Sequence, residues 1–472
     1  MANVVCVFRG RDGGRGEPPF QEANQLQFKG KSLKFLQQQG PRRGKQNRRR
    51  GGGPGGGNFN RRRGDEYDAP KASTVSVQST WQVVDQFDLA ELKKMSAVVP
   101  EATDLLTCGE LRQYNDKVER ANAKDLAQPL KLDAGVNFVY AGTLEDPVLE
   151  QLILEKKGNV FATDETLAYL MTAPRTLSGW DLVFTRVADC LFIDKRDDAG
   201  LEILTVNETL AKTMDDSKKT DAKPLPCNAP DKLGIEATAI NQLFLLQSLL
   251  PDTARKQPSA TPFAVEGQPP PQPITYRYRS WKLGAHTLVA RTELHGVQTG
   301  KGAVSAERKI MCFAINEYDP RLAGSMEWRK KLDSQSGAVL TNELKNNAAK
   351  FGRWTAQTLL AGADLMKLGF VSRVNPADPT KHVILATSSL KPSNLAEQIA
   401  LNERNMWGIL RAVVDLIMAK EPGKYLLVRV QTRQDTNKAV LRLYRVPMSS
   451  FEGEDDDANR EYEEYDEEEP DE

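Results

Sequence analysis

An alternating run of aromatic and basic residues, Tyr-Arg-Tyr-Arg-Ser-Trp-Lys from position 276, has the clearest capacity for chemistry in this chain. In an extended strand, Tyr276 and Tyr278 face one side of the sheet. The opposite side receives Arg277, Arg279 and Trp281. Aromatic rings stack on bases and guanidinium groups pair with phosphates, so this second face predicts contact with RNA. Buried tyrosines behind a solvated basic face would give the same sequence, and this alternative stays open.

A second basic and aromatic stretch covers residues 328–354. It predicts a basic turn, a short strand at 337–340, and a helix with Asn346 as its N-cap and Lys350 and Arg353 beside its apolar stripe. This composition predicts a surface that meets a polyanion; an ordinary core helix with solvated basic residues is the alternative. The RNA-contacting candidates from both stretches are Arg277, Arg279, Trp281, Arg329, Lys330 and Lys331.

The two ends of the chain carry opposite charge. Residues 1–64 hold fifteen Lys or Arg against three Asp or Glu, and residues 452–472 hold fourteen acids against one arginine. Neither end has enough apolar residues to offset the entropy of ordering, so we expect disordered tails at 1–72 and 451–472. The arginine and glycine of the first tail suit sequence-tolerant RNA contact, with a passive solubilising tail as the alternative.

The serine at position 449 precedes the acidic tail. Ser449 is a phosphorylation candidate, because acidophilic kinases recognise negative charge that follows the serine. The acidic tail could also occupy the protein's own basic groove until RNA displaces it. A plain solubility tail is the alternative to both roles.

The composition also indicates which kinds of metal or disulfide site the protein can have and in which cell compartment it works. The five cysteines have no close pair and the chain has three histidines, so neither a disulfide framework nor a metal site is expected, and no cofactor is predicted. No run of 18 apolar residues and no signal-peptide pattern occurs. We therefore expect a soluble protein of the cytoplasm with no membrane contact.

Between the tails, the residue pattern predicts strands interspersed with helices, without strict βαβ regularity and without repeats. This favours one large α+β domain over residues 73–450, with a mixed sheet and surrounding helices. A short strand is expected at Leu201–Val206, one long helix at Leu395–Lys420, and an exposed proline-rich loop at 251–273. Two hairpins are expected, Trp180–Val187 with Cys190–Asp194, and Lys424–Val430 with Ala439–Val446.

Several longer motifs occur together in one order along the chain. They are GNVFATD at 158–164, LTVNET at 204–209, EATAIN at 236–241, YRYRSWKLG at 276–284, WRKKLDSQSGAV at 328–339, ELKNN at 343–347 and WGILRAVVD at 407–415. This combination resembles the D subunit of eukaryotic translation initiation factor 3, over most of residues 75–447. The resemblance implies a non-enzymatic subunit that binds the 5′ 7-methylguanosine cap of mRNA and supports cap-dependent initiation on selected messages. The implied partners are capped mRNA, the other subunits of initiation factor 3 and the small ribosomal subunit.

The resemblance also implies which residues bind the cap. Carried over by motif, they are Asp164, Leu177, Ser178, Thr238, Asn241 and Gln242. A pocket for the positively charged methylated ring benefits from a flat surface and an acid near the ring edge. Asp164 equally suits the first turn of a helix, where the dipole favours a carboxylate, and this alternative stays open.

A polar loop inside the domain is implied to act as a gate over the RNA groove. The implied gate residues are Gly200, Leu201, Glu202, Ile203, Leu204, Thr205, Val206, Asn207, Glu208, Thr209, Leu210, Ala211, Lys212, Thr213 and Met214. Long loops in compact domains often serve as lids. A tolerated surface insertion is the alternative.

The same family resembles decapping exoribonucleases in overall fold, so hydrolysis of RNA 5′ ends is an alternative function. Such enzymes arrange carboxylates around Mg²⁺. The tripeptide from Glu343 to Lys345 keeps a Glu-x-Lys spacing, but the partner tripeptide from Glu293 ends in His295, an imidazole where a hard oxygen ligand is wanted. We therefore expect an RNA-end pocket without catalysis. A scaffold subunit that never touches the cap is a further alternative.

Overall fold

The structure is a computed structural model. It describes residues 73–125, 127–131, 135–208, 225–300, 306–319, 327–431 and 439–451. Nearly all of the two predicted tails, and residues Thr209 to Met214 of the predicted gate, lie outside the described residues. Within the described parts, every helix is too short or too polar to span a bilayer.

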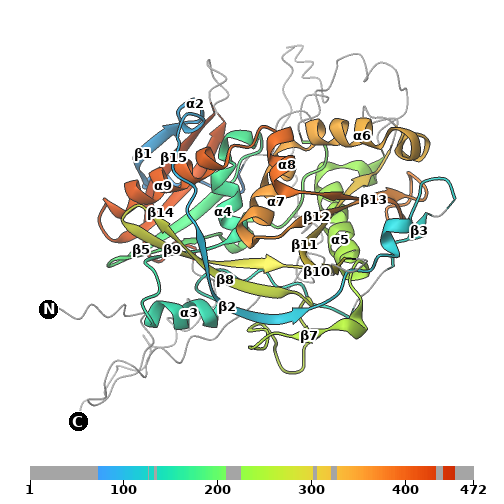
Figure 1. Ribbon diagram of the computed structural model, residues 1–472. Helices are drawn as coiled ribbons and strands as arrows, with labels where there is room; N and C mark the ends of the chain where they lie inside the picture. Colours follow the sequence, from blue (N-terminus) through green and yellow to red (C-terminus); the bar gives the residue numbers. More distant parts are fainter. Residues whose placement is uncertain are drawn as a thin grey trace, which may run out of the picture.

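Two sheets form the centre of the described chain (Figure 1). The first has ten strands in the order β1-β15-β14-β5-β6-β4-β9-β8-β2-β7. Its strands are β1 (Gln82–Asp88), β2 (Ala102–Leu111), β4 (Val160–Thr163), β5 (Asp181–Val187), β6 (Cys190–Asp194), β7 (Arg255–Lys256), β8 (Thr275–Leu283), β9 (His286–Leu294), β14 (Gly423–Gln431) and β15 (Ala439–Val446). The second has five strands in the order β10-β11-β12-β13-β3. They are β3 (Gln128–Pro129), β10 (Gly296–Thr299), β11 (Glu307–Glu317), β12 (Leu365–Arg373) and β13 (His382–Leu390).

Both sheets are mixed. In the ten-stranded sheet β4 runs parallel to β6 and β9, and in the five-stranded sheet β11 runs parallel to β12; the other described strand pairs of the two sheets are antiparallel. The helices are α2 (Leu89–Leu92), α3 (Pro147–Leu154), α4 (Asp164–Met171), α5 (Pro230–Gln247), α6 (Trp328–Asn346), α7 (Ala348–Ala361), α8 (Pro392–Gln398) and α9 (Glu403–Met418). The predicted α+β fold with a mixed sheet and surrounding helices is therefore confirmed, as are the two predicted hairpins.

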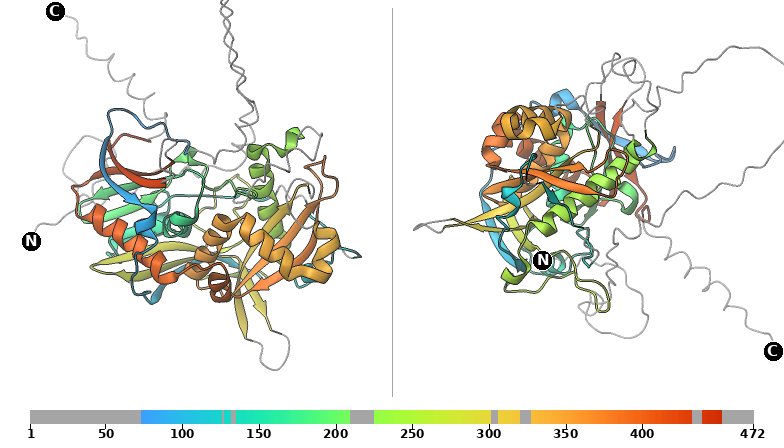
Figure 2. Two further views of the ribbon diagram at one scale, coloured as in Figure 1. Left: turned by 90° about the horizontal axis from the view of Figure 1, so that it is seen from above. Right: turned by 90° about the vertical axis from the view of Figure 1, so that its right-hand side faces the viewer.

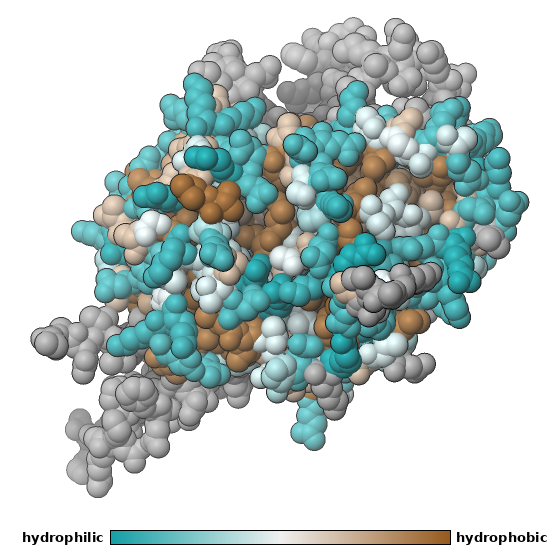
Figure 3. All heavy atoms as spheres, in the orientation of Figure 1, coloured by the Kyte–Doolittle hydropathy of each residue, from teal (hydrophilic) through white to brown (hydrophobic). Residues whose placement is uncertain are grey.

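The alternation of side chains along β11 explains how helices cover both faces of the five-stranded sheet. Ile310, Cys312 and Ala314 point into a core that includes α5, whereas Met311 and Phe313 point into a core that includes α6 and α7. Successive side chains of a strand face opposite sides, so a strand that is apolar throughout is buried on both. Figure 2 shows α5 and α6 on opposite sides of these strands. The surface in Figure 3 is mostly hydrophilic, with smaller apolar patches.

Two predicted strands were wrong, because a short apolar run does not by itself determine a strand. Residues 337–340 belong to α6, and Val339 is buried among the side chains of α7 and the five-stranded sheet. Residues 201–206 form no strand, because the polar groups of this segment bond to helix side chains instead of to a neighbouring strand.

The predicted long helix at 395–420 was also wrong in its extent. The chain forms α8 and α9, separated at Ala400, which has a positive φ of 51°. The side chain of Asn402 then accepts a hydrogen bond from the Asn405 backbone N–H and caps α9. An N-cap residue inside an apolar stripe is the signal that marks this break.

Candidate functional site

The described part of the predicted gate, residues 200–208, lies between α4 and α5. At one end, the Tyr169 hydroxyl on α4 donates a hydrogen bond to the Leu201 carbonyl at 2.9 Å. Further along, the Leu204 N–H donates to Oγ1 of Thr238 on α5, also at 2.9 Å. The segment therefore spans the space between the helices that carry Asp164 and the predicted cap residues of α5.

The other side of the segment is held by α7. The Lys350 ammonium donates to the Thr205 carbonyl at 2.9 Å, and the Lys350 backbone N–H donates to Oε1 of Glu208. The Asn207 N–H donates to Oδ1 of Asn347 at 2.9 Å. Burial lowers the pKa of Lys350 to about 8. Helix side chains thus satisfy this irregular backbone as a strand ladder would elsewhere.

Asp164 occupies the first turn of α4, as the helix-dipole alternative predicts. Thr163 caps the helix, with its side chain accepting from the Thr166 N–H and the Thr166 hydroxyl accepting from the Thr163 N–H. The Asp164 carboxylate is only 3% exposed and accepts from the Glu293 backbone N–H of β9 at 3.0 Å. The two roles predicted for Asp164, in the first turn of a helix and in the cap site, are compatible, because a carboxylate in the first turn can also face a groove.

Asp164 and Glu293 form an acidic pair. Burial raises the pKa of both carboxyls, the negative charge of Asp164 raises the pKa of Glu293 further, and the nearby Arg291 opposes these shifts. The pair therefore retains a proton at a pH where an exposed carboxyl would have lost it.

Replacing Glu293 with glutamine is expected to make the protein relatively more stable as the pH rises. A carboxyl with a raised folded pKa costs no stability below its unfolded pKa, which is near 4.5, and destabilises the fold as the pH rises through the folded pKa. The difference in Tm between Glu293→Gln and wild type should grow by roughly 2–4 °C from pH 5 to pH 8.5. About 29% of the Glu293 side chain is exposed, so water screens part of the effect.

Thermal unfolding at the two pH values measures this difference. Glu101→Gln provides the control, because Glu101 is an exposed carboxylate ahead of β2. A difference in Tm that is the same at both pH values would contradict a raised pKa for Glu293.

The three predicted residues of α5 all contact the rest of the chain. The Thr238 hydroxyl donates to the Gly234 carbonyl while accepting from the gate segment. Oδ1 of Asn241 accepts from the Ala314 N–H of β11 at 2.9 Å, and Nε2 of Gln242 donates to the Tyr140 hydroxyl at 2.8 Å. These hydrogen bonds orient one side of α5 toward the segment and the strands behind it.

Leu177 and Ser178 lie in the loop that follows α4. The Leu177 side chain is exposed, and its carbonyl accepts from Nη1 of Arg429 at 2.6 Å. Ser178 lines a small pocket together with five residues of the gate segment, Gly200, Leu201, Ile203, Thr205 and Glu208. Of the six predicted cap residues, this pocket includes Ser178 alone; Asp164 and the residues of α5 lie outside its wall.

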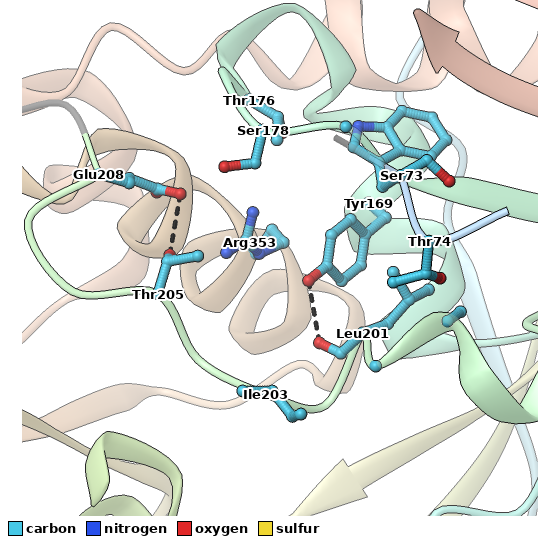
Figure 4. A pocket seen from close by; sticks show the side chains of 14 residues that line it. Ser73, Thr74, Tyr169, Thr176, Ser178, Leu201, Ile203, Thr205, Glu208 and Arg353 are labelled. Atoms are coloured by element: carbon cyan, nitrogen blue, oxygen red, sulfur yellow. Dashed lines mark hydrogen bonds between the residues drawn. The ribbon is translucent and has the colours of Figure 1, made fainter. Parts of the chain in front are cut away.

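This pocket has a volume of about 40 Å³. Figure 4 shows Arg353 entering it between Tyr169 on one side and Glu208 on the other, with Ser178 across from it. A single water needs about 10–15 Å³ by this measure, so the pocket holds about three waters. A nucleotide does not fit while the segment keeps this position.

The aromatic and basic strand candidates are not on an open surface. Arg277 is 4% exposed and pairs with Asp104 at 2.6 Å, and Trp281 packs against Trp407 of α9 with ring centroids 5.8 Å apart. Arg279 also bonds to Asp104, at 2.8 Å. These side chains fix β8 to neighbouring elements, which neither sequence-level alternative anticipated.

The basic residues at the start of α6 differ from one another in exposure. Lys330 is exposed and pairs with Glu327, whereas Arg329 is half-buried and donates to the Arg373 carbonyl at 3.2 Å. Lys331 is also half-buried, and Ser449 is exposed.

The two tripeptides that resemble a metal motif are separate. Glu343 lies on α6 beside Trp328 and Asn347, and burial raises its pKa to about 7. His295 accepts from the Cys312 N–H at 2.8 Å, and burial lowers its pKa to about 4. Among the described residues, no three His, Cys, Asp or Glu side chains gather as a metal site.

Sequence reasoning missed the burial of Arg353. A basic residue beside an apolar helical stripe reads as a solvated side chain, but Arg353 is only 6% exposed and its guanidinium lies 4.5 Å from the Tyr169 ring centroid. Because α7 is buried on most of its surface, between α4 and the five-stranded sheet, its polar positions are buried too. The small residues of α7, which include Ala349, Gly352 and Ala356, were the available signal.

Solved structures with a similar arrangement include Rai1 proteins. Rai1 of Candida albicans, solved in complex with pU5 and Mn²⁺, has 10% identity and a TM-score of 0.46, and covers 79% of this chain and 95% of its own. Rai1 of Scheffersomyces stipitis has 13% identity and a TM-score of 0.43, with 80% and 95% covered. At these values the likeness says nothing about activity.

Sequence comparison gives a closer match. The family model described as eukaryotic translation initiation factor 3 subunit 7 (eIF-3) matches residues 8–445. The D subunit of this factor from Arabidopsis thaliana is 43% identical over 383 residues, or 80% of this chain, and the D-1 subunit from Drosophila melanogaster is 42% identical over 399 residues, or 82%. The chain spans 62% and 67% of the length of these two relatives. This chain therefore belongs to the family of eukaryotic translation initiation factor 3 subunit 7, whose relatives are named as the factor's D subunits.

Proposed function

We propose that this chain is an initiation factor subunit that binds the 7-methylguanosine cap of mRNA between α4 and α5 and holds the RNA end without cutting it. Family membership supports a role in translation initiation. The observation that carries the cap proposal is the position of residues 200–208, which bond to Tyr169 on one side and Thr238 on the other. A segment placed there closes the space between the two groups of predicted cap residues.

Opening of this segment is the first step of the proposed mechanism, because the closed pocket is too small for a nucleotide. The methylated guanine carries a positive charge. Its arrival near Asp164 and Glu293 would favour the ionised pair, since a nearby cation lowers the pKa of a carboxyl. The same carboxylates would then attract the ring, which couples cap binding to release of a proton.

Holding without hydrolysis is supported by where the carboxylates lie. Glu343 on α6 contacts Trp328 and Asn347, and among the described residues it belongs to no group of three possible metal ligands. The residue two positions after Glu293 is His295, whose ring bonds to the Cys312 backbone. Oxygen ligands are what Mg²⁺ prefers, so this donor set fits the metal of a hydrolase poorly. We further propose the other subunits of factor 3 and the small ribosomal subunit as partners in the cytoplasm.

Replacing Ser178 with glutamate is expected to weaken binding of m7GpppG by at least about tenfold, or 1.4 kcal/mol. Ser178 lines the pocket, so a carboxylate there repels the phosphates of the cap. Ser393→Glu is the matched control, because Ser393 is exposed on α8. Titration of purified protein with m7GpppG and with GpppG measures the affinity and the preference for the methyl group.

Two outcomes would contradict the proposal. Equal affinity of wild type and Ser178→Glu would remove this loop from the site, and equal affinity for m7GpppG and GpppG would remove cap recognition. Incubation of cap-labelled RNA with the protein and Mg²⁺ should leave the label in place; its release would favour the hydrolase alternative.

A further inference from the structure

The guanidinium of Arg353 borders the pocket and has no hydrogen-bonding partner among the described residues. The residue is 6% exposed, and among the residues that the structure describes no carboxylate or hydrogen-bond acceptor pairs with it. Its guanidinium carbon lies over the ring of Tyr169, 4.5 Å from the centroid. A cation–π contact uses the flat face of the guanidinium and leaves its N–H edge free. That edge faces the pocket beside Ser178 (Figure 4).

Two more arginines near this pocket lack an acidic partner among the described residues. Arg175 donates to the Ile399 carbonyl, and Arg429 donates to the Leu177 carbonyl while its Nε stays unpaired. Burial alone lowers the pKa of Arg429 to about 10 and also lowers that of Arg175. The loop that follows α4 therefore lies among buried positive charges that the described carboxylates do not neutralise.

Glu208 is the acid that lines the pocket. Its two oxygens accept hydrogen bonds from the Lys350 backbone N–H at 2.9 Å and from the Thr205 hydroxyl at 2.8 Å. The carboxylate is thus directed toward the gate segment and α7, and it forms no ion pair with Arg353. Of the two charged residues that line the pocket, Arg353 is therefore the one without a hydrogen-bonding partner among the described residues.

The pocket wall also carries neutral donors. Ser178 contributes a hydroxyl, and the buried Thr176 Oγ1 and Trp180 Nε1 have no partner among the described residues. The volume of about 40 Å³ suits a tetrahedral group and excludes a purine ring. A guanidinium fork with hydroxyl donors around a space of this size is the arrangement that binds phosphate.

We propose that Arg353 anchors a phosphate-binding site in this pocket, which takes one phosphate of the RNA 5′ end. That this phosphate belongs to an RNA 5′ end rests on the proposed cap function. That the pocket binds phosphate at all rests on the residues that line it. The N–H edge of Arg353 meets the pocket without an acceptor among the described residues. A phosphate supplies that acceptor through charge-assisted hydrogen bonds.

The acidic tail is a second source of negative charge. It begins beyond Phe451, which packs on Trp81 and lies 5.5 Å from the Arg196 guanidinium, and Arg196 bonds to Thr74 of the pocket wall. We choose phosphate because its oxygens can meet the guanidinium and several hydroxyl donors at once, whereas a carboxylate has two oxygens. The test below also detects the alternative, in which the acidic tail occupies the pocket.

The test compares three probes on the full chain: m7GpppG, 7-methylguanosine without phosphate, and inorganic triphosphate. Arg353→Gln should lower the affinity for m7GpppG and for triphosphate roughly tenfold and leave that for 7-methylguanosine unchanged. Arg353→Lys should lose about threefold, because lysine keeps the charge but not the fork. Arg411→Gln is the control and should change none of the three affinities, because the Arg411 side chain is exposed on α9.

Each other result overturns the inference. Equal losses for 7-methylguanosine and m7GpppG would give Arg353 a structural role, no loss would remove it from the site, and a gain for m7GpppG would show that the tail occupies the pocket. If wild type binds triphosphate through Arg353 but not 7-methylguanosine, the cap proposal fails while the phosphate site stands. Should Arg353→Gln fail to fold in a thermal melt, Arg353→Lys decides by the same three affinities.

Discussion

Replacing Arg291 with glutamine is expected to lower the free energy of unfolding by about 3–5 kcal/mol. Arg291 lies in β9, is 5% exposed, and pairs with Oδ2 of Asp146 at 2.7 Å. Asp146 is 0% exposed, caps α3 through the Val148 and Leu149 N–H groups, and accepts from the Tyr278 hydroxyl. Without the guanidinium, the carboxylate keeps its hydrogen bonds but becomes an uncompensated buried charge.

Denaturant unfolding measures this loss against that of Arg411→Gln. Arg411 forms an exposed pair with Asp415 on α9, at 3.3 Å, and exposed pairs contribute about 0–1 kcal/mol. The two variants remove the same group, so burial is what differs between them. Similar losses in both would show that the Asp146 pair is solvated.

Arg291 also links the fold to the candidate site. Its charge lowers the pKa of both Asp164 and Glu293. Its removal should therefore raise both pKa values and strengthen the pH dependence expected for the pair. Both the stability of the core and the ionisation of Asp164 and Glu293 therefore depend on the Arg291 side chain.

The parts of the fold that sequence could predict are those determined by local pattern. The hairpin of β5 and β6 follows from two β-rich runs separated by Ala188 and Asp189, and Ala188 adopts the positive φ of 50° that the tight turn requires. Asp164 at the start of α4 follows from a Thr-Asp-Glu-Thr sequence in which Thr163 and Thr166 can form a capping box. Residues close together in the sequence determine both the β5–β6 hairpin and the start of α4.

The parts that sequence could not predict depend on partners far along the chain. The backbone of residues 200–208 is satisfied by Thr238, Asn347 and Lys350, none of which a short window around the segment contains. Arg277 is buried because Asp104, 173 positions away, pairs with it. Periodicity reports which side a residue faces, but not whether another element covers that side.

Thr238→Val is expected to release the gate segment. In the closed position the Leu204 N–H donates to the Thr238 hydroxyl at 2.9 Å, and Thr238 is only 3% exposed. Valine has the same shape and no acceptor, so the amide is left unsatisfied when closed and can bond to water when open. This costs the closed state about 1–3 kcal/mol, which raises the open population by roughly 5–150-fold.

Hydrogen–deuterium exchange over residues 200–208 measures that population, because these amides exchange when the segment opens. Thr355→Val is the matched control, because Thr355 is also a buried helix residue. The Thr355 hydroxyl donates to the Phe351 carbonyl, just as the Thr238 hydroxyl donates to the Gly234 carbonyl. The Thr355 hydroxyl bonds to no described gate residue. Exchange should rise in Thr238→Val alone, with α5 still protected. If exchange over the segment is the same in both variants, Leu204 does not hold the gate through Thr238.

The affinity of Thr238→Val for m7GpppG then separates two roles of the hydroxyl. If exchange rises and m7GpppG binds more tightly, the Thr238 hydroxyl acts mainly to close the groove. If exchange rises and m7GpppG binds more weakly, the hydroxyl also contacts the cap.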